Sequence, residues 1–121
     1  MTAAKYLLTG ARILGAEPTD ILIEDTEIAV EIPSPYIDGM SGSNFTGRRL
    51  NIHGGVDGIK AGDNTTIECS WIHDMTSFAS DPNQGGGPTH NDAIQILEGT
   101  GIRVVGNQLI AAKDQNAAIQ I

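Results

Sequence analysis

Residues 51–74, NIHGGVDGIKAGDNTTIECSWIHD, contain the pattern from which the fold is predicted. Short segments with alternating apolar residues surround Ile59, Ile67 and Ile72, and Gly, Asn and Asp residues separate these segments. Such punctuation indicates short strands joined by turns, because a helix needs an apolar repeat that runs over about ten uninterrupted residues. The same kinds of segment recur on both sides of this stretch, which indicates a repeat protein.

One repeated block is ten residues long and occurs five times without gaps: KYLLTGARIL from Lys5, DILIEDTEIA from Asp20, NFTGRRLNIH from Asn44, NTTIECSWIH from Asn64 and GIRVVGNQLI from Gly101. Its ninth position is always a large aliphatic residue: Ile13, Ile28, Ile52, Ile72 and Leu109. The second and fourth positions are mostly apolar, which predicts the inward face of a strand. Polar residues such as Asp25 and Ser70 follow, which predicts a bend into a second short strand.

A second, shorter block alternates with the first: IDGMSG from Ile37, VDGIKAG from Val56, NDAIQI from Asn91 and NAAIQI from Asn116. Its fourth position is Met40, Ile59, Ile94 or Ile119. One coil would therefore contain a second-block strand, a turn, a first-block strand pair and a return loop. Because successive coils stack about 4.8 Å apart, equivalent aliphatic residues would lie over one another.

We therefore predict an all-β fold, a right-handed parallel β-helix of about five coils in one domain over residues 1–121. Residues 1–19 are expected to form an incomplete N-terminal coil or cap, because the first two blocks start only 15 residues apart. Residues 75–91 are predicted to form a long inserted loop. The block NAAIQI ends in the middle of a coil, so we expect a segment of a longer β-helix, or another chain that covers this end.

The negative charge of the chain argues against nucleic acid as a partner. The net charge is −8 with a pI near 4.5, and nucleic acid binding usually needs a basic patch instead. No apolar run approaches the roughly 20 residues that span a bilayer, so no membrane insertion is expected. Gly10 and Arg12 interrupt any signal-peptide core. Secretion without a cleaved signal, a trimmed chain and assembly inside a cell all remain open, and a phage structural protein fits the last.

The runs NIHGGVDGIKAGDNTTIECSWIHD, QGGGPTHNDAIQI and NQLIAAKDQNAAIQI carry a family resemblance. Residues 44–121 resemble right-handed parallel β-helix proteins of actinobacteria and their phages, in the pectate-lyase-like superfamily. The resemblance implies the fold but not one activity, since that superfamily includes polysaccharide lyases, glycan hydrolases, phage tailspikes and proteins with no catalytic role. It also implies Ca²⁺ as a cofactor to consider, because lyases of this fold often hold uronate carboxylates with it.

Three aspartates share the second position of the shorter block: Asp38, Asp57 and Asp92. Stacked carboxylates repel one another unless a cation or hydrogen bonds offset the charge, and oxygen clusters suit Ca²⁺. The alternative is that each aspartate accepts hydrogen bonds from local backbone N–H groups at the entrance of its strand. A cation site and backbone hydrogen bonding are therefore both possible roles for these aspartates.

The fifth position of the shorter block points outward and holds Lys60 and Gln95. Gln95 and Gln120 would form an amide ladder, and Gln95 is also a candidate glycan ligand. Lys60 could act as a lyase base if its pKa were lowered, although an ordinary ion pair with Asp57 or Asp63 is the alternative. Arg103 is a further candidate acid or base.

The long inserted loop is the best candidate for a binding site, because loops longer than about 12 residues are often functional. Its glycines, Gly86 among them, allow close approach to a ligand, and Phe78 could stack on a sugar ring. Gln84 and Asn91 are candidate binding residues, and His90 a candidate acid or base. The alternative is a loop packed on its own side chains or on a neighbouring subunit.

His53 and His73 share the tenth position of the first block, so they should stack on adjacent coils. Such a pair could bind a metal together with Asp74, or it could form a polar ladder outside the core. Trp71, at an outward position, could be a carbohydrate platform or a subunit contact.

Two functions follow from these patterns. The first is a structural and glycan-recognition module of a phage tail, spike or cell-surface protein, located in the virion tail or outside the cell. Its partners would be a cell-surface polysaccharide and either its own subunits, for example as a homotrimer, or other tail proteins. The second is a polysaccharide lyase or glycoside hydrolase that acts on an acidic or cell-wall glycan.

Overall fold

A computed structural model describes residues 6–7, 11–12, 21–110 and 117–121 of the chain. In these residues the regular structure is all strand, apart from one 3₁₀ turn, η1 (Pro82–Gln84). The strands are two to four residues long, as the Gly and Asn punctuation predicts. No helix in the described ranges has the length and apolar character needed to cross a bilayer.

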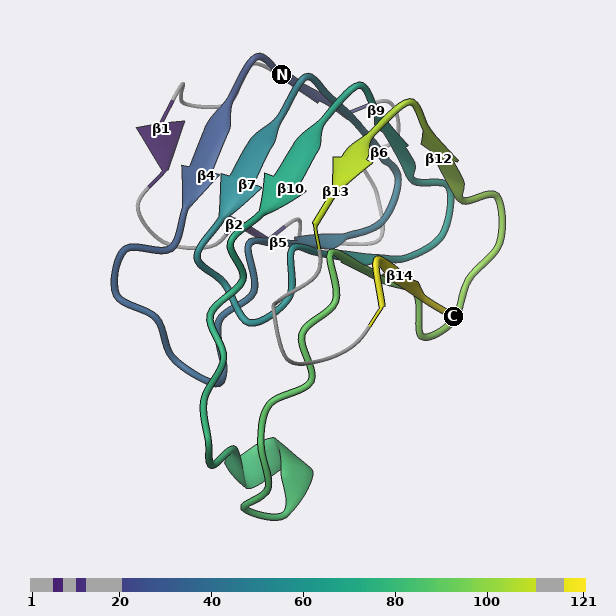
Figure 1. The fold of residues 1–121 in the computed structure, drawn as a ribbon. Coiled ribbons are helices and arrows are strands. Elements are labelled where there is room, and N and C mark those ends of the chain that lie inside the picture. Colours follow the sequence, from purple (N-terminus) through teal and green to yellow (C-terminus); the bar gives the residue numbers. More distant parts are fainter. Residues whose placement is uncertain (1–5, 8–10, 13–20, 111–116) are drawn as a thin grey trace.

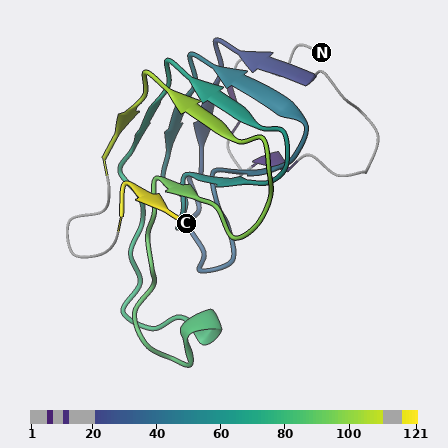
Figure 2. The same cartoon turned by 90° about the vertical axis from the view of Figure 1, so that its right-hand side faces the viewer.

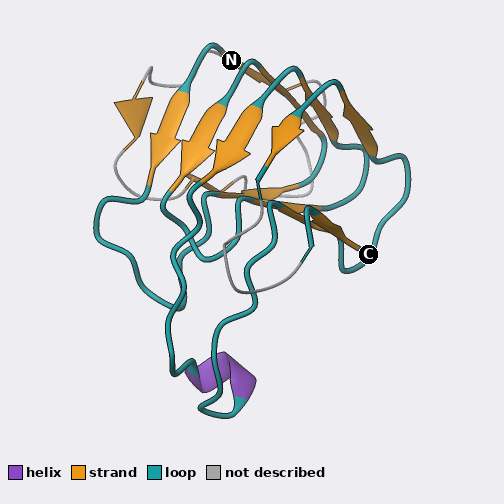
Figure 3. Ribbon diagram, viewed as in Figure 1, coloured by secondary structure: helices purple, strands orange, loops and turns teal. Residues whose placement is uncertain are grey.

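The strands form three parallel sheets, here named A, B and C (Figures 1 and 3). Sheet A has the order β1 (Tyr6–Leu7), β4 (Glu27–Ala29), β7 (Asn51–His53), β10 (Trp71–His73) and β13 (Gln108–Leu109). Sheet B has the order β14 (Ile119–Gln120), β11 (Ile94–Gln95), β8 (Ile59–Ala61), β5 (Met40–Gly42) and β2 (Ala11–Arg12). Sheet C has the order β12 (Arg103–Val105), β9 (Thr66–Glu68), β6 (Phe45–Arg48) and β3 (Ile21–Glu24).

From β5 onward the chain visits sheets B, C and A in turn, so each circuit adds one strand to every sheet. Figure 2, turned by 90°, shows the successive circuits lying side by side. The all-β architecture and the stacking of parallel strands are therefore confirmed, and they are consistent with a parallel β-helix.

The predicted vertical registry of the aliphatic residues is also confirmed. Ile28, Ile52, Ile72 and Leu109 lie opposite one another in sheet A, and Met40, Ile59, Ile94 and Ile119 do so in sheet B. The first three of each column have no exposed surface, and they form one core with Phe45 and Ile67. Each fully buried aliphatic side chain stabilises the fold by about 1.5–3 kcal/mol relative to exposure.

The alignment of the first block is wrong. Tyr6 lies opposite Glu27 in sheet A and not in the sheet that holds Ile21, and Leu7 takes the position over Ile28. Residues 11–12 pair with β5 in sheet B instead of continuing the first block. Alternation of apolar residues specifies an inward face but not the sheet, so a segment rich in Leu and Ala matched the wrong strand. Ile13 and most of the expected cap at residues 1–19 lie outside the described residues.

The bend between sheets C and A is formed by the sixth residue of the first block. Asp25, Arg49 and Cys69 each have a φ of 51°, and Gly106 has a φ of 66°. Left-handed backbone is costly for residues with a side chain, and the Arg49 guanidinium stabilises one such bend by binding the carboxylate of Asp25 (Nε–Oδ1 2.6 Å). The predicted bend is thus confirmed and recurs on every described coil of this block.

Candidate functional site

Two return loops project on one side of the stack, next to sheet B. The first joins β4 to β5 (residues 30–39), and the second joins β10 to β11 (residues 74–93). Figures 1 and 2 show that the second loop extends far from the stack and carries η1 near its tip. The two loops meet where Asn83 Nδ2 donates a hydrogen bond to the carbonyl oxygen of Pro35 (3.4 Å). The predicted long loop is therefore present and lies against a second, shorter loop.

The base of the long loop is tied down by Asn91, whose side chain is completely buried. Its Nδ2 donates to the carbonyl oxygens of Val56 (2.7 Å) and Thr76 (2.8 Å), and its Oδ1 accepts from the hydroxyls of Ser77 and Thr89. Every hydrogen-bonding group of this amide is used within the chain. Asn91 therefore does not reach a ligand as predicted, and it fixes the direction in which the loop leaves the stack.

A cavity of about 450 Å³ lies between the two loops and the outer face of sheet B. Its lining contains six of the residues selected from the sequence: Asp38, Asp57, Lys60, Gln84, His90 and Gln95. The volume is within the range of about 300–1,000 Å³ that is usual for ligand sites. Residues from three return loops and two strands of sheet B thus converge on one place.

Lys60 lies at the centre of the charged groups in this cavity. Its Nζ is 3.1 Å from Asp38 Oδ2 and 3.4 Å from Asp57 Oδ2. Burial alone would lower the pKa of Lys60, but the attraction of Asp38 and Asp57 outweighs it and raises the pKa above its ordinary value. The ion pair with Asp57, which was the alternative, is therefore present, and the lowered pKa that a base would need is not found at Lys60.

Asp57 has the most perturbed carboxyl group of the cavity. Only 4% of its side chain is exposed, and this burial raises the pKa of Asp57 to about 6, although the N–H of Asp92 and the Lys60 ammonium act in the opposite direction. The carboxylates of Asp38 and Asp92 raise it further. A carboxyl group of this kind gains and loses a proton close to neutral pH, which is the property of a general acid.

Two of the three stacked aspartates accept hydrogen bonds from backbone groups of the next coil. Asp57 Oδ1 accepts from the N–H of Asp92 (2.8 Å), and Asp92 Oδ1 accepts from the N–H of Ala117 (3.1 Å). Asp92 Oδ2 is buried with no hydrogen-bond partner in the described part of the chain. The backbone alternative is thus correct for Asp57 and Asp92, although their partners lie one coil away and not within the same turn.

The metal predictions gain no support from this geometry. Within residues 6–7, 11–12, 21–110 and 117–121, no group of three or more His, Cys, Asp and Glu side chains is placed to hold a metal ion. The cation between Asp38 and Asp57 is the Lys60 ammonium. The charge compensation expected from Ca²⁺ is therefore provided there by a side chain.

Four of the other predicted residues do not line the cavity. Trp71 lies on β10 in sheet A, and Arg103 lies on β12 in sheet C, each with an exposed side chain. Phe78 is half-buried on the arm of the long loop, where its backbone N–H donates to the hydroxyl of Thr89 (2.8 Å). Gly86 is exposed with a φ of 87°, next to Gly85, which ends η1. Gly86 thus shapes the turn at the loop tip.

The predicted histidine stack is present on sheet A. The rings of His53 and His73 are 5.1 Å apart and tilted by 26°, and Trp71 stacks on His73 at 3.6 Å. Three of the four ring nitrogens contact protein groups: His53 Nε2 contacts Glu27, and the two nitrogens of His73 contact Asp74 and Asn51. The stack is therefore a polar ladder on the outer surface, which was the alternative to a metal site.

Tyr36 is an aromatic residue of the cavity that sequence reasoning missed. It lines the cavity from the first return loop, and 66% of its surface is exposed. An aromatic side chain that stays exposed beside a polar cavity suits stacking on a ligand. The available signal was its place in PSPYID, directly before a second-block strand, in a chain with only two tyrosines. Leu97, which is 75% exposed, lines the same cavity.

Comparison of the chain with family models, with curated proteins and with solved structures finds no match. The interpretation of the cavity therefore depends on its own geometry and chemistry.

Proposed function

We propose that this chain is a glycan-recognition module on a right-handed parallel β-helix of a phage tail, spike or cell-surface protein related to the pectate-lyase-like superfamily. The ligand is a polysaccharide that lies over sheet B between the two return loops. The location that follows from this proposal is the virion tail or the outside of a cell.

The observation that carries the proposal is the composition of the cavity wall. Amide groups from Gln84 and Gln95, carboxylates from Asp38 and Asp57 and the exposed ring of Tyr36 surround one volume of about 450 Å³. Sugars present hydroxyl groups that need both donors and acceptors, and apolar ring faces that stack on aromatic side chains. Gln95 is positioned for this role by an amide ladder, because its Nε2 donates to Gln120 Oε1 (3.0 Å).

Titration calorimetry with a panel of cell-wall and capsular oligosaccharides tests the proposal. Replacement of Tyr36 by Ala removes the stacking surface without touching the core, and we expect it to weaken binding about tenfold or more, as loss of an aromatic contact does. Trp71→Ala is the matched control, since it removes an exposed aromatic residue from sheet A. Equal loss of affinity in both variants, or no binding by the parent protein to any glycan, would reject the proposal.

A second candidate function, hydrolysis of a glycan, is favoured by the pKa of Asp57. Glycoside hydrolases use two carboxyl groups, one of them a general acid with a raised pKa. Asp57 has a pKa of about 6, and Asp38 lies on the other side of the same ammonium group. Release of reducing ends near pH 5.5 that Asp57→Asn abolishes would establish this activity, and absence of product with glycans that bind would dismiss it.

Association with further subunits is the remaining part of the proposal. Ile119 is 39% exposed and Ile121 95% exposed, whereas Ile59 and Ile94 in the preceding coils have no exposed surface. Strands β12, β13 and β14 have no further strand on their outer side in the described part of the chain. Apolar, unpaired edges favour association, as a homotrimer or with other tail proteins. Light scattering that finds a compact monomer at all concentrations would contradict this.

A further inference from the structure

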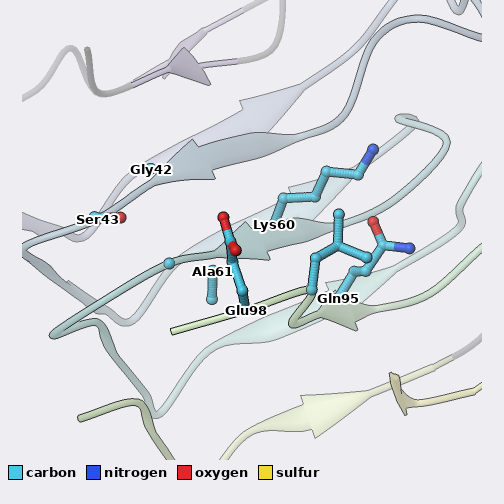
Figure 4. A pocket seen from close by; sticks show the side chains of 8 residues that line it. Gly42, Ser43, Lys60, Ala61, Gln95 and Glu98 are labelled. Atoms are coloured by element: carbon cyan, nitrogen blue, oxygen red, sulfur yellow. The ribbon is translucent and has the colours of Figure 1, made fainter. Parts of the chain in front are cut away.

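A second hollow lies beside the cavity on the outer face of sheet B. This hollow has a volume of about 210 Å³ and is lined by Ser43, Gly62 and Glu98 at its far side. Lys60, Gln95 and Leu97 line both spaces. Figure 4 shows the side chains of Lys60 and Gln95 projecting from neighbouring strands, with Glu98 and Ser43 nearby. The two spaces, which share these three residues, are together named the groove, and they lie over β5, β8 and β11.

The groove has a strong excess of negative charge. Its carboxylates are Asp38, Asp57, Asp81 and Glu98, and its only Lys or Arg side chain is Lys60. The ammonium of Lys60 is already bound by two of these carboxylates. Asp81 is buried, with its Oδ1 accepting from the N–H of Asn83 (2.8 Å). Among the lining residues no Lys or Arg side chain is therefore left to bind an acidic sugar, and the net charge of −8 for the whole chain adds to the repulsion.

Glu98 differs from the other carboxylates of the groove. It is exposed at the end that lies away from Asp38, and it makes no ion pair with any described residue. An exposed, unpaired carboxylate at the edge of a binding groove attracts a ligand cation without the cost of breaking an internal pair. It therefore supplies a position where a positively charged group of a ligand is favoured.

We propose that the groove selects linear glycans that carry free amino groups, that it binds their neutral N-acetylated forms less tightly, and that it rejects uronate polymers. This selectivity rests on the proposed function, because it assigns a ligand class to the same groove. The carboxylate of Glu98 receives the ammonium group of an amino sugar. The amide groups and the Tyr36 ring bind the parts of the polymer that all three ligand classes share.

Three probes of similar length and different charge test the selectivity: a β-1,4-linked glucosamine tetrasaccharide, its fully N-acetylated counterpart and a tetragalacturonate. Titration calorimetry at pH 6 and low ionic strength keeps the amines protonated and the uronates ionised. Two unit charges about 4 Å apart in water-like surroundings interact strongly enough for roughly a fivefold change in affinity. We expect the amine form to bind about fivefold tighter than the N-acetylated form, with no detectable binding of the uronate.

The variant Glu98→Gln keeps the size and hydrogen bonding of the side chain and removes its charge. We expect it to remove most of the preference for the amine form, so that the affinities of the variant for the amine and N-acetylated forms differ by less than about twofold. Added salt should reduce the preference in the parent protein in the same direction. Far-ultraviolet circular dichroism of the variant checks that the fold is retained.

The possible results separate the selectivity from the glycan-binding function. If the N-acetylated form binds but the amine form binds no tighter, or if the uronate binds best, the selectivity is overturned while glycan recognition stands. If Glu98→Gln leaves the preference unchanged, the assignment of the ammonium position is wrong. If none of the three probes binds, and no oligosaccharide of the wider panel binds either, the proposed glycan-binding function is rejected.

Discussion

Replacement of Asp57 by Asn removes the one buried carboxyl group whose pKa is raised to about 6. The substitution keeps the shape of the side chain, so the oxygen that accepts from the N–H of Asp92 can remain in place. Lys60 keeps Asp38 as an ion-pair partner. The change therefore isolates the cost of ionising a carboxyl group in this cavity.

The sign of the effect follows from the two states of the chain. The carboxyl group has a pKa of 3.8 as a model value and about 6 in the folded protein, so the folded state holds its proton more tightly. Its contribution to stability is fully present below pH 3.8 and is lost as the pH rises through about 6. For this shift, the loss between pH 4 and pH 8 is about 2 kcal/mol. Asp57→Asn lacks this loss, so its stability relative to the parent protein should increase by that amount over the same interval.

Urea unfolding followed by circular dichroism at pH 4, 5, 6, 7 and 8 measures the effect for both proteins. The quantity compared is the difference in unfolding free energy between variant and parent, since other titrating groups contribute equally to both. Glu98→Gln, which removes an exposed carboxylate, is the control for the loss of one negative charge. A difference between Asp57→Asn and the parent that stays constant from pH 4 to pH 8 would refute the argument from burial.

Three further substitutions test the packing of the coils. Gly58→Ala would place a methyl group against the Ala93 carbonyl oxygen and Ile72 Cγ2, so we expect the unfolding free energy measured with urea to fall by about 2 kcal/mol or more. Gly87→Ala at the loop tip is the control, and an equal effect there would argue against a specific clash. Ile72→Ala should cost about 2–5 kcal/mol, because Ile72 is fully buried between Ile52 and Leu109, and a cost below about 1 kcal/mol would contradict the registry. Asn91→Ala leaves the carbonyl groups of Val56 and Thr76 without the donors that Asn91 supplies. We expect the unfolding free energy to fall by about 2–4 kcal/mol and proteolysis of the long loop to become faster. A loop that stays protected from proteolysis would show that other contacts hold it.

Much of the cavity could be found from the sequence, but with incorrect roles for several residues. The repeat placed Asp57, Lys60 and Gln95 near one another, because equivalent positions in neighbouring coils must stack. It could not show that the Lys60 ammonium contacts both Asp38 and Asp57. Asn91 and Trp71 were selected for their chemical type. Asn91 is buried and its amide makes hydrogen bonds within the chain, whereas Trp71 lies on sheet A, away from the cavity.

The vertical order of the coils could be predicted from the amino-acid sequence alone. A residue such as Ile52 must recur at the same position of every coil, since a polar residue there would be buried without a partner, and this requirement is visible as a repeat. Which loops approach each other could be seen only in the tertiary structure. The contact between residues 30–39 and 74–93, and with it the place of Tyr36 beside the cavity, depends on the direction in which Asn91 holds the long loop. Apart from the second-block residues at their ends, these return loops carry no repeat from which their position could be predicted.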